Sequence, residues 1–103
     1  MDAREKKLAH KVVSGRNDLT LKYLNQVQKC IEHLDRIGLH VINVEFCKIK
    51  PTVRVQAPYL DQEQHLVNDY RAIRFMNGND SGRFQEYQMM VEGIRVVWRA
   101  YLH

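Results

Sequence analysis

Residues 18–37 carry the strongest helical pattern in the chain. Apolar residues recur there at steps of three, four and three positions, which places them on one face of a helix. The predicted buried stripe consists of Leu24, Val27, Ile31 and Leu34, with Tyr23, Cys30 and Ile37 along one flank. Asn17 or Asp18 is suited to cap the start, and Gly38 followed by Leu39 fits a Schellman ending. The pattern predicts one long amphipathic helix.

After this helix the apolar period changes to two, which is typical of strands. Residues 41–47 and 52–57 alternate in this way, and residues 48–51 connect them. Antiparallel pairing of the two segments sets Phe46 beside Val53, Val44 beside Val55 and Ile42 beside Ala57, and places Glu45 opposite Arg54. One register thus yields both an apolar face and a charge pair, which predicts a hairpin.

Residues 83–102 predict a second hairpin, with its turn at Glu92-Gly93. The predicted pairs are Val91 with Ile94, Met89 with Val96 and Tyr87 with Trp98 on one face, and Glu86 with Arg99 and Gln88 with Val97 on the other. Again one register satisfies an apolar face and a charge pair. Glu-Gly is a weaker turn signal than Asn-Gly, because glutamate disfavours positive φ.

The remaining segments are less regular. Residues from Asp61 to Tyr70 fit either a helical turn or a loop, Ile73 and Phe75 fit a short strand, and residues 77–82 have the composition of a loop tip. Residues 2–13 predict a short helix that precedes Gly15. The expected fold class is α+β, with one long amphipathic helix packed on an antiparallel sheet of two hairpins, in the order α-ββ-ββ. We expect an N-terminal basic arm or short helix over 1–16 and a single α+β domain over 17–103.

Composition narrows the class of protein. The chain has 103 residues, of which 45% are hydrophobic and 27% are charged, which suits one globular domain. Its apolar runs are too short for a transmembrane helix or a secretory signal, and its N-terminal residues are polar. Two distant cysteines do not make a disulfide framework, so we expect a cytoplasmic protein.

A net charge of +4 allows a polyanionic partner without requiring one. The candidate nucleic-acid-binding residues are Lys6, Lys7, Lys11 and Arg16 in the arm and Lys48, Lys50 and Arg54 at the first hairpin. A sheet that reads single strands also needs exposed aromatic rings for base stacking. The predicted registers bury Trp98, Tyr87 and Phe46 and leave mainly Tyr101 and Phe84 outward, which weakens this alternative.

The sequence contains neither a complete set of metal ligands nor a recognisable catalytic motif. Cys30 and His33 form half of a metal site at i and i+3, and His40 and Cys47 are the residues that would have to complete it, but a structural zinc needs four well-spaced ligands. No nucleophile lies in a strand–turn–helix elbow, and no glycine-rich phosphate loop is present. We therefore expect no metal, no cofactor and no enzymatic activity.

Protein binding is the remaining class. The outward face of the second hairpin carries the candidate protein-binding residues Met90, Arg95, Val97, Arg99 and Tyr101. Methionine, tyrosine and arginine are enriched at interface cores. Edge strands of such a sheet can also pair between subunits, so a homodimer is a further alternative.

The two hairpin segments resemble a known group of proteins. The stretches Gly82-Arg83-Phe84 and Val91 to Arg99, together with Gly38-Leu39 and the segment from Pro51 to Val55, are similar to small accessory proteins of temperate phages and related mobile elements. The resemblance implies a non-enzymatic protein that binds a host or phage protein, or DNA, to regulate, inhibit or protect. Its expected function is thus regulation or inhibition of a host macromolecule through protein–protein contact, with nucleic-acid binding as the alternative.

Overall fold

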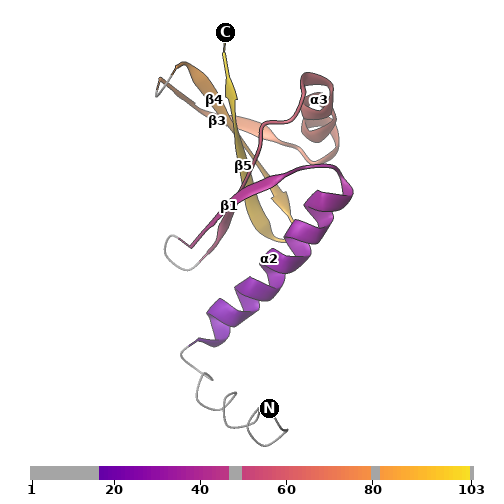
Figure 1. The fold of residues 1–103 in the computed structure, drawn as a ribbon, viewed down its shortest axis with the longest axis vertical. Helices are drawn as coiled ribbons and strands as arrows, with labels where there is room; N and C mark the ends of the chain where they lie inside the picture. The colour runs from indigo at the N-terminus through magenta and orange to yellow at the C-terminus, as the bar shows by residue number, and fades with distance from the viewer. Residues whose placement is uncertain (1–16, 47–49, 80–81, 103) are drawn as a thin grey trace, which may run out of the picture.

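A computed structural model describes residues 17–46, 50–79 and 82–102, which form a five-stranded mixed sheet with helices (Figure 1). The elements in chain order are α2 (Asp18–Arg36), β1 (Val41–Glu45), β2 (Thr52–Val55), α3 (Leu60–Asp69), β3 (Ile73–Gly78), β4 (Phe84–Val91) and β5 (Ile94–Tyr101). The α+β class is confirmed. The short helix expected over residues 2–13 lies outside the described residues.

The strand order corrects the expected antiparallel sheet of two hairpins. The order is β1-β2-β5-β4-β3, and β2 runs parallel to β5 at the centre. The segment between β2 and β4 supplies the helix α3 and the edge strand β3, which pairs antiparallel with β4. Of the two interpretations of residues 61–70, the helical one is correct. The predicted loop tip begins later than expected, because β3 continues through Asn77 and Gly78.

Helix α2 begins and ends close to the predicted positions. Gly38 adopts a φ of 81°, and the two hydrogen bonds of a Schellman motif run from Gly38 N to Asp35 O at 3.1 Å and from Leu39 N to Leu34 O at 2.9 Å. The buried stripe is rotated from the predicted one, since Val27, Cys30 and Leu34 are buried whereas Leu24 is 46% exposed. The N-terminal end of α2 projects away from the sheet (Figure 1), and in this part of the helix Leu19, Leu21 and Leu24 are exposed whereas Tyr23 packs partly against the core.

One hydrophobic core lies between the helices and a single face of the sheet. It joins buried residues of α2, α3, β2, β4 and β5, and the partly buried Val41 and Val44 of β1 pack against them. Trp98 of β5 is fully buried there, stacks on Tyr87 at a centroid distance of 5.4 Å, and donates from Nε1 to Oε1 of Glu63 on α3 at 3.2 Å. Because both helices pack on this face, the opposite face of the sheet is covered by no described helix.

The register of the first hairpin differs from the predicted one. Val44 pairs with Val53 rather than Val55, and Glu45 pairs with Thr52 rather than Arg54. A register shift between Val41 and Asn43 marks a bulge, which breaks the simple alternation. Val41 and Val44 therefore both pack against the core, whereas Ile42 and Phe46, which were predicted to be buried, are exposed.

The register of the second hairpin is confirmed at every predicted pair, from Val91 with Ile94 to Glu86 with Arg99. Its turn places Glu92 at a φ of 53° and Gly93 at 75°. Two successive positive φ values are the signature of a type I′ turn, whose twist matches that of the strands. The hairpin thus forms without a bulge despite a glutamate at a position that glycine or asparagine would prefer.

Candidate interaction surface

We call the sheet surface opposite the helices the open face. It carries the even-numbered residues of β4, the odd-numbered residues of β5, Arg54 of β2 and Phe75 of β3. The residues of this face that are described below are Arg54, Phe75, Phe84, Glu86, Gln88, Met90, Arg95, Val97, Arg99 and Tyr101. All five residues predicted to bind a protein partner therefore lie on one face.

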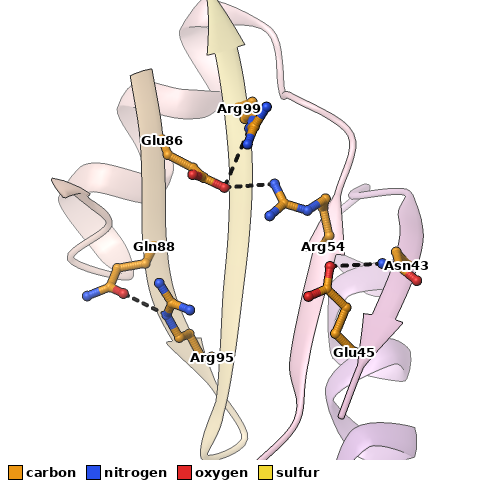
Figure 2. A network of polar contacts seen from close by, with 7 residues as sticks. All are labelled: Asn43, Glu45, Arg54, Glu86, Gln88, Arg95 and Arg99. Carbon is orange, nitrogen blue, oxygen red and sulfur yellow. Dashed lines mark hydrogen bonds and ion pairs between the residues drawn. The ribbon is translucent and has the colours of Figure 1, made fainter. Parts of the chain in front are cut away.

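A buried carboxylate organises the centre of the open face. Glu86 is 4% exposed and accepts Nη1 of Arg54 at 2.9 Å, while Nε of Arg99 lies 3.7 Å from the same Oε1 atom. Figure 2 shows Arg54 reaching across β5 to Glu86 on β4. The predicted partner of Arg54, Glu45, instead accepts Nδ2 of Asn43 at 3.0 Å. The sequence therefore identified Glu86 with Arg99 but missed the contact that joins β2 to β4.

The third arginine is held by different neighbours. Arg95 donates from Nε to Oε1 of Gln88 at 2.8 Å (Figure 2). Its guanidinium carbon lies 4.9 Å from the centroid of the Phe75 ring. These contacts leave the two Nη groups of Arg95 for other acceptors. Arg54, Arg95 and Arg99 are each half-buried, so each guanidinium is ordered by a neighbour and still reaches solvent.

Two residues expected on the outer surface are buried. Phe84 is 3% exposed, since the guanidinium of Arg99 lies 4.0 Å above its ring and the ring packs against Gly78 of β3. Val97 is 1% exposed, because its neighbours on the same face, Arg95 and Arg99 along β5 and Arg54 in register on β2, all have long side chains. Val97 therefore packs beneath the three arginine side chains. The prediction that it contacts a protein partner is wrong, because it is buried.

Exposed apolar side chains flank the arginines. Met90 is 61% exposed at one end of β4 and Tyr101 is 45% exposed at the opposite end of the neighbouring strand. Ile73 and Phe75 of the edge strand β3 are also exposed, and Ile73 and Met90 both line a hollow of about 280 Å³. Sequence reasoning missed Ile73 and Phe75, although the short strand that it suggested for them was the available signal.

A larger hollow lies at the other end of the arginine row. Its volume is about 620 Å³, and Ile42, Arg54, Arg99 and Tyr101 line it. The bulge in β1 explains its apolar wall, because the changed register leaves Ile42 exposed. The open face is thus a polar ridge between two hollows that have apolar walls.

The residues of the nucleic-acid alternative are not brought together by the described structure. Lys6, Lys7, Lys11, Arg16 and Lys48 lie outside the described residues. Lys50 is exposed beside Pro51 at the start of β2, whereas Arg54 is committed to Glu86. Of the seven basic residues proposed to bind nucleic acid, the described structure therefore places two. Lys50 is exposed to solvent, whereas Arg54 forms an ion pair with Glu86.

A second polar cluster lies on the helix side of the molecule. His33 of α2 bonds through Nδ1 to Oε2 of Glu92 at 3.0 Å and through Nε2 to the hydroxyl of Tyr70 at 2.9 Å. A carboxylate can only accept, so Nδ1 of His33 donates to it, and in the neutral ring Nε2 accepts from Tyr70. The chain of bonds joins α2, the β4–β5 turn and the end of α3, and the bond from His33 lowers the pKa of Glu92.

The structure places three of the four residues that were considered as metal ligands, namely Cys30, His33 and His40. Cys30 is buried in the core, and burial raises the pKa of its thiol to about 11, which keeps it protonated. His33 is occupied by Glu92 and Tyr70, and Cys47 lies outside the described residues. Across residues 17–46, 50–79 and 82–102, no three His, Cys, Asp or Glu side chains gather as metal ligands would.

Comparisons with known proteins place the chain in a family. A family profile described as "Uncharacterised protein" matches residues 5–101. The chain belongs to this family. No curated protein matches the chain, and no solved structure matches it. In the part of the chain that the structure describes, no helix is both long and apolar enough to cross a membrane.

Proposed function

We propose that this protein is a non-enzymatic binding protein that docks an acidic protein surface on its open face. The observation that carries the proposal is the row of three arginines, Arg54, Arg95 and Arg99, each held by a neighbouring side chain and each partly open to solvent. Ordered guanidinium groups match the geometry of carboxylates and can bind them through paired hydrogen bonds. The proposal follows the expectation drawn from the sequence and adds the charge of the partner.

Preorganisation supports this use of the arginines. Immobilising a long side chain on binding costs roughly 0.5–1.5 kcal/mol, which weakens an interface built from mobile side chains. Here the contacts of Arg99 with Glu86 and Phe84, and of Arg95 with Gln88 and Phe75, restrict these side chains before any partner arrives. Most of that ordering cost is therefore absent from the binding step.

The apolar flanks supply the second requirement of an interface. Met90 and Tyr101 are exposed at opposite ends of the arginine row, and each borders a hollow that a partner's apolar side chain can enter. Interface energy concentrates in aromatic, methionine and arginine side chains that become buried on docking. The open face offers all three types within one surface.

The two phenylalanine rings of the open face favour a protein partner over single-stranded nucleic acid, and among the described residues Tyr101 is the exposed ring of this face that carries no guanidinium group. Base stacking needs a free ring face, but the rings of Phe75 and Phe84 already have guanidinium groups over them, and Phe84 is buried. We therefore retain nucleic acid only as an outcome of the test.

We also propose a cytosolic location, from the cysteine content, and an origin in a phage or mobile element, from the resemblance of the hairpins. Gene neighbours unrelated to such elements would contradict that origin.

Site-specific photocrosslinking in cells tests the docking surface. We would replace Met90 or Tyr101 by p-benzoylphenylalanine, one at a time, and use exposed Gln28 on α2 as the control position. Both open-face positions are expected to give an adduct of the same mass that protease removes and nuclease leaves intact. Adducts at neither position, or adducts that nuclease digests, would overturn the proposal.

A charge reversal tests the acidic character of the partner. Arg95→Glu leaves the Glu86 cluster untouched, because Arg95 bonds to Gln88 instead. It is expected to abolish the adduct at Tyr101 while circular dichroism stays unchanged. The control Lys29→Glu makes the same change in charge at an exposed position on α2 and should leave the adduct in place. Equal loss in both variants would show that net charge, rather than this face, matters.

A further inference from the structure

We propose that a pocket between α2 and the first residues of β2 and β5 binds a small organic anion with an apolar body. We call it the basic pocket. It has a volume of about 410 Å³, and its walls include Lys22, Tyr23, Lys50, Pro51, Met90 and Arg95. Sites for small molecules span roughly 300–1,000 Å³ and combine apolar walls with a few polar groups, and this pocket meets both criteria.

The charges around the basic pocket all have one sign. Lys22 comes from α2, Lys50 from the residues before β2, and Arg95 from β5, while none of the lining residues is acidic. Three cations brought together from separate elements repel one another, and a pocket wall of low dielectric strengthens their combined field. An anion inside the pocket would offset that repulsion.

The described structure provides no internal counter-charge for the two lysines. Neither Lys22 nor Lys50 forms an ion pair with any other described residue, whereas Arg54 and Arg99 of the open face share Glu86. Arg95 is fixed by its bond to Gln88, which leaves its Nη groups as donors at the pocket rim. The basic pocket thus has one ordered donor and two lysines that are able to move toward a ligand.

The apolar residues that line the basic pocket favour a ligand with an apolar group next to its charged group. Tyr23 is half-buried, Pro51 is buried and Ile94 is fully buried, so these three lining residues give the pocket an apolar wall that is anchored in the core. A plain inorganic anion would leave that wall in contact with water, whereas an aromatic or branched aliphatic group would cover it. The ligand class is therefore an aryl or alkyl carboxylate or phosphate monoester, in which the charged group meets the lysines.

Isothermal titration calorimetry of the full chain tests the basic pocket with 2-naphthoate, 2-naphthyl phosphate and the uncharged 2-naphthamide. We expect both anions to bind more tightly than the amide, by about tenfold or more. The stronger of the two anions identifies the preferred head group. Perturbed NMR resonances of Gly93 and Ile94 would locate the ligand. No binding of either anion at millimolar concentration, or perturbed resonances confined to another surface, would overturn the proposal.

Matched variants separate the pocket charges from net charge. Lys22→Gln with Lys50→Gln is expected to weaken binding of the stronger anion at least tenfold and to leave binding of the amide unchanged. Lys29→Gln with Arg36→Gln removes the same charge from exposed positions of α2 and should change neither. Equal weakening in both pairs would refute a specific pocket. Lys22 and Lys50 lie off the open face, so the adduct at Tyr101 should persist in the first pair, which keeps this test distinct from that of protein docking.

Discussion

Glu86 illustrates how one buried carboxylate orders a whole surface. It contacts arginines from two strands other than its own and is almost fully withdrawn from water. The neighbour on β5 was predictable, because a hairpin register places Arg99 directly opposite Glu86. The contact with Arg54 was not predictable, because β2 and β4 meet only through the strand between them. Local pairing rules describe cross-strand neighbours and do not extend to next-nearest strands.

Removing this carboxylate should destabilise the protein measurably. Glu86→Ala leaves Arg54 and Arg99 as neighbouring cations without their acceptor, and we expect the free energy of unfolding to fall by about 2–3 kcal/mol. Glu45→Ala removes only a bond to Asn43 near the surface, and its cost should stay below about 1 kcal/mol. Urea denaturation measures both values. Comparable losses in the two variants would show that the Glu86 cluster has no special role.

Glu92 gives the stability a defined pH dependence. The hydrogen bond from His33, and then the positive charges of His33, Arg36 and Lys29, hold the pKa of Glu92 below its ordinary value of 4.5. A lowered folded-state pKa means that this stabilisation is complete above about pH 4.5 and is lost as pH falls through the lower folded value. The melting temperature of the native protein should therefore exceed that of Glu92→Gln at pH 6, and the gap should shrink as the pH falls below 4.5. A gap independent of pH would rule out this contribution.

At the scale of the elements, the two hairpins show what a sequence pattern can and cannot determine. The second hairpin has two strands of eight residues joined by a two-residue turn, and one register aligns its apolar pairs on one face and places Glu86 opposite Arg99 on the other. The first hairpin has shorter strands and a longer connection than predicted, so that Glu45 already pairs with Thr52 and Val44 with Val53, and the bulge between Val41 and Asn43 then shifts the pairing by one further position. The sequence does not distinguish a helix from a loop over residues 61–70, because α3 is short and Leu66 is its one fully buried residue.

Two glycines are expected to respond differently to the same substitution. Gly38→Ala places a side chain at a φ of 81° where the nearest atom is 3.6 Å away, so the cost is conformational and about 1 kcal/mol. Gly78→Ala drives a methyl group into the Phe84 ring, since an added Cβ would lie 2.0 Å from the nearest ring carbon, and we expect a cost near 3 kcal/mol. Urea denaturation compares the two.

A double variant checks the origin of the larger cost. Phe84→Leu in the Gly78→Ala background reduces the bulk that the added methyl group meets. The pair should therefore cost less than the sum of its single substitutions. Strict additivity would mean that the ring does not cause the destabilisation, and the packing of β3 on β4 would need another explanation.

For the whole molecule, the parallel contact between β2 and β5 decides the architecture. Val53 and Val96 pair across it, although they lie far apart in the chain. Two predicted hairpins can join edge to edge in several ways, and alternation within each hairpin does not distinguish them. The choice follows from the helices, because α2 and α3 together cover the face that carries Trp98 and Val96. The class was thus available from the sequence, whereas the strand order required contacts distant along the chain.

Trp98 should report on the unfolding of the entire domain. It is fully buried, and its indole donates to Glu63, so its fluorescence depends on both the sheet and α3. We expect the urea transitions followed by fluorescence and by far-ultraviolet circular dichroism to coincide. Glu63→Ala should cost about 1 kcal/mol more than Asp61→Ala, which alters the same turn of α3 without touching Trp98. Separate transitions would indicate that α3 unfolds independently.

The burial of Cys30 also makes its alkylation rate a measure of how often α2 opens. Its thiol is fully shielded beneath α2 and stays protonated under ordinary conditions, so an alkylating reagent cannot attack it in the closed state. Reaction at this sulfur requires α2 to lift from the sheet. In a Cys47→Ser background, the labelling rate at Cys30 therefore measures how often the longest helix opens, and a ligand that holds α2 against β2 and β5 would slow that rate in proportion to its occupancy.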